Sequence, residues 1–388
     1  MRDPTDVVIA GAGPAGSIAA LVLARAGARV RLVDRARFPR EKLCGDTLNP
    51  GTMGALRRLG VGDAIERRSL RLAGMVVSGP GGVTVRGSYR RGSAEPAGCA
   101  ITRREVDALL LDAALAAGVR FDDAVMVVGP LLSGAAGDQT VRGIEVRGRT
   151  GARLAVPGRV TIAADGRRSV VAGVLGLVRH PRNVRRWAVG GYYAGVAGLG
   201  TYGEMHVRTD HFVGIAPIPG GLANVCLVTP AQRALSDPAA LLSRIVTADA
   251  LLRDRFVAAR RAGPVVSMGP LATDARAAGV AGLLLAGDAA GFIDPITGDG
   301  MFFAVRGGEM AARAALEMLD SGRADGHRRL VRLRAAEFGA KWRFNRAVRV
   351  VTGSTLGVRL GSASAAVAPW VMRRMIHYAG DTGVERRR

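Results

Sequence analysis

The stretch TDVVIAGAGPAGSIAALVLARAGARVRLVDR, residues 5–35, decides the fold of this chain. It opens with a short apolar run, Val7–Ala10, and continues into a glycine-rich turn, 11–16, with the spacing GxGxxG. The alanine- and leucine-rich segment 18–26 favours a helix, and the apolar run 28–33 favours a second strand. The order strand, turn, helix, strand predicts a βαβ unit that opens a parallel sheet.

The glycine-rich turn and the residue that ends the second strand have the spacing of a dinucleotide site. Gly11 and Gly13 would let backbone amides approach a pyrophosphate, and Gly16 would let the helix pack on the strand. Asp34, which lies 18 residues after Gly16, is placed to accept both ribose hydroxyls of an adenosine. The residues expected to contact the dinucleotide here are Gly11, Gly13, Pro14, Ala15, Gly16, Asp34 and Arg35.

Two later stretches repeat the pattern of an apolar strand that ends in an acidic turn. VTIAADG, residues 160–166, precedes a helix that Ser169 would open. LLLAGD, residues 283–288, precedes a long helix expected from about Asp299.

With these three motifs in this order, the chain resembles the FAD-dependent group that includes aromatic hydroxylases and geranylgeranyl reductases, over about residues 5–319. The resemblance implies FAD as cofactor, with Asp288 on the ribityl chain and Pro295 against the isoalloxazine. The amides of 298–301 would face N1 and O2 of the flavin, where a helix N-terminus stabilises the negative charge of the reduced ring. The further cofactor residues implied in this way are Cys44, Gly45, Asp46, Arg103, Asp165, Gly287, Asp288, Pro295, Gly298, Gly300 and Met301.

Arg103 is expected to contact the cofactor because of the segment in which it lies, ITRREVDALLLDAAL, residues 101–115. It matches the family's Arg-x-x-apolar-Asp helix start, which touches the cofactor. The neighbouring Arg104 could touch the cofactor instead. For each of the two arginines, a solvent-exposed charge at the start of a helix, with no contact to a cofactor, is an equally good interpretation.

Between these motifs the periodicity changes from helical to alternating. Residues 72–89 and 187–228 alternate as β-hairpins do, and 341–378 is helical and basic. The sequence therefore predicts a mixed α/β (α+β) fold: a Rossmann-like FAD-binding domain, an inserted antiparallel β-sheet substrate domain and a C-terminal helical segment. We assign 1–71, 101–175 and 271–330 to the FAD-binding domain, 72–100 and 176–270 to the substrate domain, and 331–388 to the helical segment.

Composition narrows the function class further. The net charge is +23, but the basic residues are nearly all arginine and form no stripe interleaved with aromatics, so we expect no nucleic-acid partner. The three cysteines have no CxxC spacing and the five histidines no metal spacing, so we expect no disulfide scaffold and no metal. We expect a cytoplasmic enzyme, whose basic C-terminal segment either caps the substrate domain or contacts the inner face of the membrane peripherally.

Cys44 is the candidate catalytic residue. It lies in FPREKLCGDTLNPG, residues 38–51, where flavoproteins of this kind send a loop beside the isoalloxazine. LCGD, residues 43–46, resembles the cysteine-glycine motif of geranylgeranyl reductases, in which the cysteine faces the flavin and the substrate double bond. A thiol there could donate the proton opposite the hydride, or could simply pack.

One strand departs from that of the geranylgeranyl reductases. Where they have an aromatic Tyr-x-Trp-x-Phe-Pro strand, this chain has FVGIAP, residues 212–217. Phe212 and Pro217 are kept, but Gly214 and Ala216 replace two rings, which opens volume in the pocket. We expect Phe212, Gly214 and Pro217 to contact a substrate that is bulkier than a polyprenyl chain or of another type.

The expected function is an FAD-dependent oxidoreductase that passes hydride from reduced flavin to a C=C bond of an apolar, isoprenoid or lipid-like substrate. NAD(P)H is the expected transient donor, with a ferredoxin as the alternative. A second hypothesis is an FAD-dependent monooxygenase that hydroxylates an aromatic or polyketide-like substrate through C4a-hydroperoxyflavin. A third is an FAD-binding structural or redox-sensing protein with a reactive Cys44 and no substrate-dependent flavin reoxidation.

Overall fold

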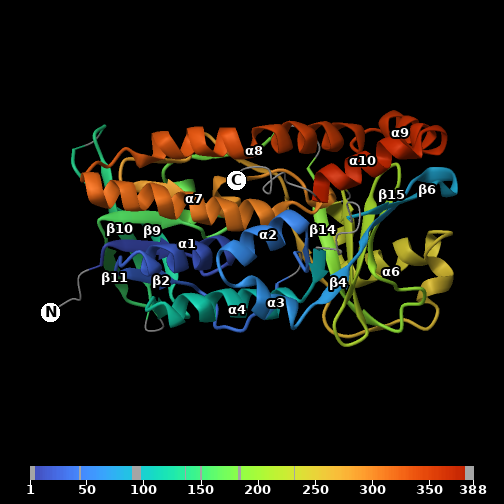
Figure 1. Cartoon of the computed structure of the whole chain (residues 1–388), viewed down its shortest axis with the longest axis horizontal. Helices are drawn as coiled ribbons and strands as arrows, with labels where there is room; N and C mark the ends of the chain where they lie inside the picture. The colour runs from blue at the N-terminus through green and yellow to red at the C-terminus, as the bar shows by residue number, and fades with distance from the viewer. Residues whose placement is uncertain are drawn as a thin grey trace.

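The N-terminal βαβ unit lies in the middle of a six-stranded sheet with the order β21-β22-β12-β1-β2-β8 (Figure 1). The computed structural model describes residues 5–42, 45–89, 98–135, 137–148, 151–181, 185–230 and 232–380. The strands are parallel except for β21, which pairs with its neighbour in the opposite direction. Their bounds are β1 (Val7–Ala10), β2 (Val30–Val33), β8 (Arg120–Asp122), β12 (Val160–Ala163), β21 (Gly279–Val280) and β22 (Leu283–Leu285).

Three helices cover one face of this sheet: α1 (Pro14–Arg25), α4 (Arg103–Ala116) and α7 (Gly300–Ser321). Helices α1 and α7 come unusually close, because Gly308 of α7 faces the backbone of α1. A Cβ at Gly308 would lie 2.3 Å from the carbonyl oxygen of Ala15. The close packing of α7 on α1 therefore depends on a glycine at this position.

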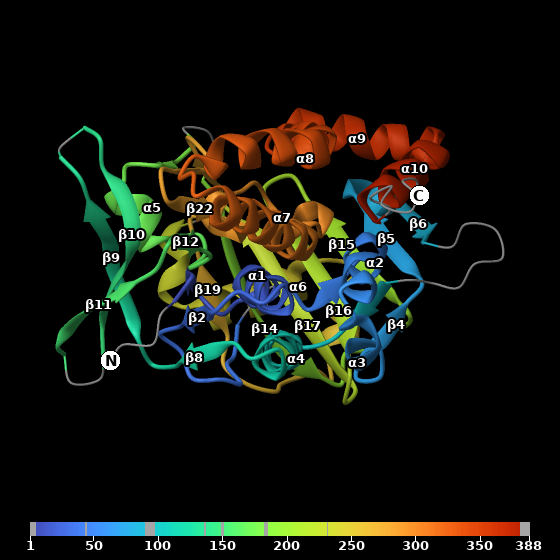
Figure 2. The same ribbon diagram turned by 60° about the vertical axis from the view of Figure 1, so that its left-hand side comes forward.

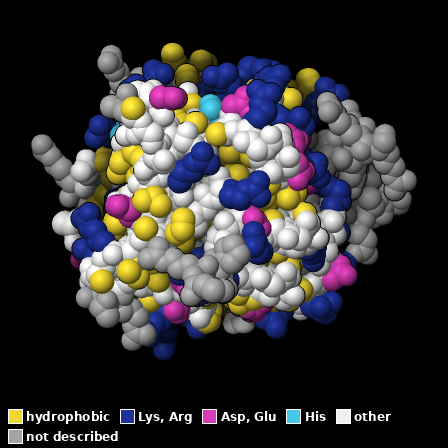
Figure 3. All heavy atoms as spheres, turned by 90° about the vertical axis from the view of Figure 1, so that its left-hand side faces the viewer, with side chains coloured by type: hydrophobic (Ala, Val, Ile, Leu, Met, Phe, Trp, Pro, Cys, Tyr) yellow, Lys and Arg dark blue, Asp and Glu magenta, His cyan; other side chains and the backbone are white. Residues whose placement is uncertain are grey.

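The other face of the sheet is covered by a small antiparallel sheet and a short helix (Figure 2). Strands β1, β2, β12 and β22 are buried because both of their faces are covered. On the surface at this end of the molecule, basic side chains are scattered among apolar and acidic ones (Figure 3). The covering elements are β9 (Met126–Ser133), β10 (Thr140–Arg147), β11 (Arg153–Pro157) and α5 (Val170–Val174).

The two alternating segments of the sequence build one second sheet. Its order is β18-β14-β17-β16-β15-β5-β6, with β19 also paired to β14. The expected antiparallel pairing holds except between β5 and β15, which are parallel because they come from separate segments that no hairpin joins. Helix α6 (Pro238–Ala248) packs on one face. The strands are β5 (Gly74–Ser78), β6 (Thr84–Ser88), β14 (Trp187–Ala194), β15 (Tyr202–Val207), β16 (Phe212–Ile218), β17 (Leu222–Thr229), β18 (Arg260–Arg261) and β19 (Val266–Met268).

The C-terminal segment forms three helices that run over α7 and over the second sheet (Figure 1). They are α8 (Gly326–Val351), α9 (Thr355–Val367) and α10 (Pro369–Gly380). The segment boundary assigned at residue 331 falls inside α8, which begins at Gly326. Among the described residues, no helix combines the length and apolar character needed to cross a bilayer.

Shorter elements connect these layers, and the mixed α/β fold class is confirmed. The short helices are α2 (Pro50–Arg58), α3 (Gly62–Glu66), η1 (Pro80–Gly82), η2 (Gln232–Ser236), η3 (Arg253–Phe256), η4 (Gly287–Ala290) and η5 (Pro295–Thr297). The short strands are β3 (Thr47–Leu48), β4 (Leu70–Leu72), β7 (Gly98–Ala100), β13 (Val178–Arg179), β20 (Thr273–Ala275) and β23 (Gly291–Phe292).

The neighbouring glycines of α7 give a direct test of its packing. We expect Gly308→Ala to lower the free energy of unfolding by about 1–3 kcal/mol, because its methyl group meets rigid backbone. At Gly307 a Cβ would lie 3.5 Å from the nearest atom. Gly307→Ala should therefore be neutral or stabilise by up to about 1 kcal/mol, through helix propensity. Urea unfolding measures both variants, and equal effects would contradict the close contact.

Candidate functional site

Four neighbouring parallel strands bring the predicted dinucleotide residues to one edge of the six-stranded sheet. Gly11 follows β1, Asp34 follows β2, Asp165 follows β12, and Gly287 and Asp288 follow β22. Ligands of open α/β sheets bind outside the carboxyl ends of the strands. The three sequence motifs therefore converge on the edge where a dinucleotide is expected.

The glycine-rich turn is shaped for close packing on one side and open space on the other. Gly11 has φ +96°, and a Cβ there would lie 2.5 Å from the carbonyl oxygen of Ala164. A Cβ at Gly16 would lie 1.8 Å from the carbonyl oxygen of Gly11. At Gly13, by contrast, the Arg40 guanidinium, 3.6 Å from a Cβ, is the only group of the described residues within 4 Å. Gly13 precedes α1 without a side-chain cap, so the first-turn amides suit an anionic ligand.

Asp34 holds the turn in place and stays half-buried. One carboxylate oxygen accepts a hydrogen bond from the amide of Ala12 at 2.8 Å, and the other accepts one from Ala36 at 2.8 Å. Because each oxygen can accept more than one hydrogen bond, both can also receive ribose hydroxyls. The neighbouring Arg35 is exposed.

Of the two neighbouring arginines, Arg103 is buried and Arg104 is exposed. Arg103 is 5% exposed, and its Nε and Nη2 each donate to the carboxylate of Asp107 at 2.8 Å. Arg40 also approaches Asp107, at 3.0 Å. Arg104 is exposed and pairs with Glu41 at 3.2 Å. The match to the family's helix start therefore falls on the buried arginine.

A third cation, Lys42, completes this group. Burial and the neighbouring positive charges of Arg103 and Arg40 lower the pKa of Lys42 to about 8, against the opposing effect of Asp288. Arg40 lies beside Gly13 at the uncapped start of α1, and Lys42 and Arg103 add positive charge next to Arg40, a combination that suits a diphosphate. The residues present therefore fit the expected dinucleotide.

Gly45 lies between Arg103 and the start of α7. Gly45 has φ +97°, and a Cβ there would lie 3.0 Å from the guanidinium of Arg103 and 3.4 Å from the sulfur of Met301. Only glycine combines this backbone conformation with so little space. Cys44, the candidate catalytic residue, lies outside the described residues, and its role stays a prediction.

Asp46, the residue after Gly45, has a buried carboxyl group. Its Oδ1 accepts from the amide of Arg103 at 2.7 Å and its Oδ2 from Asn224 at 2.6 Å. Burial raises the pKa of Asp46 to about 6. Asn224 was missed by the sequence analysis, although a polar residue within the apolar strand LANVCLV was the available signal.

The segment before α7 is fixed by a buried ion pair that the sequence did not reveal. Asp294 accepts from Arg186 at 2.9 Å, and both side chains are buried. Asp294 also accepts from the amide of Ile296 at 3.2 Å and so begins the turn that contains Pro295. The turn closes at Gly298 with φ +70°.

Asp299, directly before α7, is a buried meeting point of three other segments. Its Oδ1 accepts from Lys341 at 2.6 Å and from Asn49 at 3.1 Å, and its Oδ2 accepts from Asn345 at 3.3 Å. Lys341 also donates to the carbonyl of Ala379 at 2.7 Å. These bonds fix α8, α10 and the loop before α2 to the start of α7.

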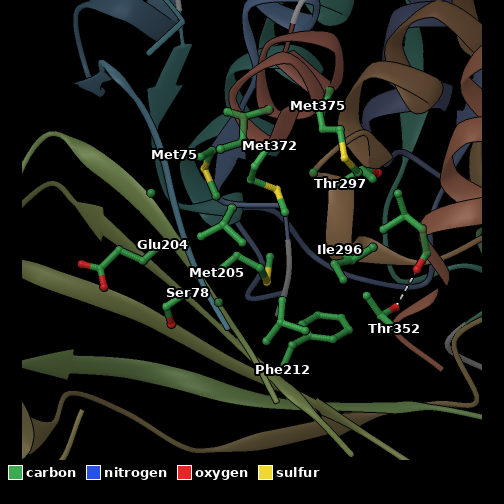
Figure 4. A pocket seen from close by; sticks show the side chains of 18 of the residues that line it. Met75, Ser78, Glu204, Met205, Phe212, Ile296, Thr297, Thr352, Met372 and Met375 are labelled. Carbon is green, nitrogen blue, oxygen red and sulfur yellow. Dashed lines mark hydrogen bonds between the residues drawn. The ribbon is translucent and has the colours of Figure 1, made fainter. Parts of the chain in front are cut away.

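A cavity of about 530 Å³ lies between the second sheet and helices α8–α10. It reaches the loop 45–49 and the turn 295–298, so it meets the dinucleotide edge at the positions expected to flank the flavin ring. Its lining is mostly apolar, and Figure 4 shows methionine side chains from both walls turned toward one another. The side chains that mark its walls are Met75, Val77, Met205, Phe212, Ile296, Phe344, Val348, Met372 and Met375.

Two of the three predicted pocket residues line the cavity, and the third is buried in the protein away from it. Phe212 and Gly214 line the cavity, whereas Pro217 is buried on the same strand outside its lining. Glu204 turns its carboxylate away from the cavity (Figure 4). On that far side, Arg255 Nη2 donates to Glu204 Oε1 at 2.8 Å. Within the described ranges, no cluster of His, Cys, Asp and Glu could hold a metal ion.

Comparison with known proteins places these features in a family context. Residues 4–329 match the family described as FAD binding domain. A menaquinone reductase of Mycobacterium tuberculosis is 32% identical over 335 residues, covering 82% of this chain and 77% of that protein. A digeranylgeranylglycerophospholipid reductase of Methanosarcina mazei is 27% identical over 333 residues, covering 83% of this chain and 77% of that protein.

A solved structure shares the fold. The myxobacterial chondrochloren halogenase CndH, described as a variant of FAD-dependent halogenases, matches with a TM-score of 0.83 and 22% identity. The match covers 96% of this chain and 91% of that chain. At this identity, the likeness concerns the arrangement of the elements alone.

The buried carboxyl group of Asp46 predicts a specific pH dependence of stability. Its pKa rises from an ordinary 3.8 to about 6 on folding, so the folded chain binds the proton more tightly than the unfolded chain. The contribution of Asp46 to the free energy of unfolding is therefore most favourable below about pH 4. It falls by about 3 kcal/mol as the pH rises to about 6. We expect Asp46→Asn to remove this loss, as measured by urea unfolding between about pH 4 and 8.

Asp112→Asn on the exposed side of α4 is the matched control. Its pH profile should follow that of the unmodified chain. Identical profiles for the two variants would show that Asp46 does not carry this effect.

Proposed function

The chain belongs to the FAD binding domain family, as its motifs predicted, and is an FAD-dependent oxidoreductase; from this premise, we propose that it reduces a C=C bond in an apolar, isoprenoid-like substrate. The observation that carries the proposal is the apolar cavity, which meets the expected flavin groove at 45–49 and 295–298. A substrate held there would lie beside the ring, which is the arrangement that hydride transfer needs.

The walls of the cavity support an apolar and flexible substrate. Four methionines line it, namely Met75, Met205, Met372 and Met375, and their unbranched thioether side chains adapt to irregular apolar shapes. Its volume of about 530 Å³ lies within the range of small-molecule sites, about 300–1,000 Å³. The side chains of Asp46, Asn49 and Asn224 give the wall some polar groups.

The names of two relatives agree with this substrate class. One is a menaquinone reductase and the other a digeranylgeranylglycerophospholipid reductase. Menaquinone and geranylgeranyl lipids both carry isoprenoid chains. Both relatives are therefore named for the reduction of a molecule that carries an isoprenoid chain, and we propose the same class of substrate for this chain.

The residues of the site have distinct proposed tasks. Arg40, Lys42 and Arg103 would bind the diphosphate of FAD, and Asp34 would bind its ribose. The first amides of α7 would place positive potential at the flavin ring. FAD, when bound and reduced, supplies the hydride for the double bond.

A proton must reach the second carbon of the double bond. Cys44 remains the proposed donor on the strength of its family motif. Asp46, two residues later on the cavity wall, is a second candidate, because its raised pKa keeps a proton on the carboxyl group closer to neutral pH than an exposed aspartate would.

The reductant of the flavin is proposed to be NAD(P)H, which would bind only transiently. The expected dinucleotide edge is the carboxyl edge of the six-stranded sheet, and the predicted FAD occupies it. A second dinucleotide would therefore approach the flavin transiently from outside, with Asp165 and Gly166 nearby.

The proposal predicts the product of an anaerobic reaction. Protein reduced under nitrogen by NADH or NADPH should convert a short-chain prenyl quinone into a product that has gained two hydrogens in its prenyl chain. Mass spectrometry of the side-chain fragments distinguishes this product from a quinol reduced only in its ring. In air, a monooxygenase would instead add one oxygen atom to the substrate.

A variant that narrows the cavity gives the control. A Cβ at Gly214 meets only ordinary contacts, the nearest at 3.7 Å, so Gly214→Leu would extend into the cavity while leaving the flavin groove intact. We expect the variant to keep its FAD and its reduction by NAD(P)H but to lose at least about tenfold in kcat/KM. Gly173→Leu, at an exposed position of α5, should behave as the unmodified chain. Oxygen addition, or substrate-independent flavin chemistry alone, would contradict the proposal.

A further inference from the structure

Exposed apolar side chains gather on the outer faces of α9 and α10. Leu356, Leu360 and Val367 share one side of α9 and are 67%, 59% and 88% exposed. Trp370, at the start of α10, is 58% exposed, and the Arg374 guanidinium lies 5.6 Å from its ring centre. We call Leu356, Leu360, Val367 and Trp370 the apolar rim.

The part of the chain that carries the apolar rim is basic throughout. Residues 338–380 contain seven Lys or Arg and no Asp or Glu. Arg359 on α9 and Arg373 and Arg374 on α10 are exposed beside the rim. An anionic surface that approached this face would therefore meet positive charge, and residues 338–380 carry no acidic group to oppose it.

The inner faces of the same two helices line the apolar cavity. Met372 and Met375 point into it from α10 (Figure 4). Ser364 on α9 and Val371 on α10 line the cavity and are also exposed to solvent. The apolar rim on the outside and the cavity wall on the inside therefore belong to one pair of helices.

We propose that α9 and α10 dock on an anionic lipid bilayer, with the apolar rim inserted into the interface and the exposed arginines on the phosphate headgroups. An apolar molecule could then pass from the bilayer into the cavity without crossing water. This route rests on the proposed function, whereas the docking itself does not depend on any reaction.

A second copy of this chain fits the same face poorly. A two-fold contact through α9 and α10 would place two sets of exposed arginines opposite each other, and neither set has an acidic residue in 338–380 to compensate. The headgroups of an anionic bilayer supply the missing negative charge, and its acyl region accepts the apolar rim.

Vesicle flotation of the unmodified chain tests the proposal and needs no turnover. In about 0.15 M salt, the protein should float with vesicles of phosphatidylglycerol and phosphatidylcholine, and much less with phosphatidylcholine alone. The variant Leu356→Ser/Leu360→Ser/Val367→Ser should bind the anionic vesicles about tenfold more weakly or worse. Arg359→Gln/Arg373→Gln/Arg374→Gln should lose the preference for anionic lipid.

The matched control removes three exposed apolar residues elsewhere, as Leu154→Ser/Val174→Ser/Val257→Ser. All variants change exposed side chains, so their thermal unfolding midpoints should stay close to that of the unmodified chain. The control variant should bind vesicles normally. Absence of vesicle binding, equal loss in the control and rim variants, or a rim-dependent dimer in sedimentation velocity would each overturn the proposal.

Discussion

The buried ion pair between Lys341 and Asp299 is the interaction on which the candidate site depends. Its ammonium group lies 2.6 Å from the carboxylate and 2.7 Å from the carbonyl of Ala379, so one side chain connects α7, α8 and α10. Lys341 is one of only two lysines in the chain, and a compact ammonium with three donors suits two acceptors in different directions. Loss of either partner would leave a buried charge uncompensated, at a cost of about 3–5 kcal/mol.

This constraint joins two environments that differ in polarity. The turn 295–298 and the first amides of α7 belong to the expected flavin site, and Arg40, Lys42 and Arg103 form the cationic group expected to bind the diphosphate. Helices α8–α10 belong to the apolar cavity. Because Asp299 lies between the turn 295–298 and helix α8, the helices that line the cavity are bound directly to the segment expected to contact the flavin. An apolar substrate and a charged cofactor can therefore meet at a fixed boundary.

The parts of the site that follow from local sequence were predicted, whereas the long-range pairs were not. Gly11 and Gly16 could be identified from the GxGxxG spacing between a strand and a helix, and the structure leaves no room for a side chain at either position. The bond between Asp46 and Asn224 joins residues 178 positions apart, and nothing local to either residue identifies its partner. The basic C-terminal helices were expected, but helical periodicity does not state which sheet a helix will cover. Cys44 is still known only by its motif.

The most direct measurement is a crystal structure of the protein with FAD and a prenylated ligand. We predict that the isoalloxazine lies between 45–49 and 295–298, and that the prenyl chain fills the cavity with a double bond against the ring. A flavin bound away from these two segments would contradict it. So would a ligand that occupied another site and left the cavity to solvent.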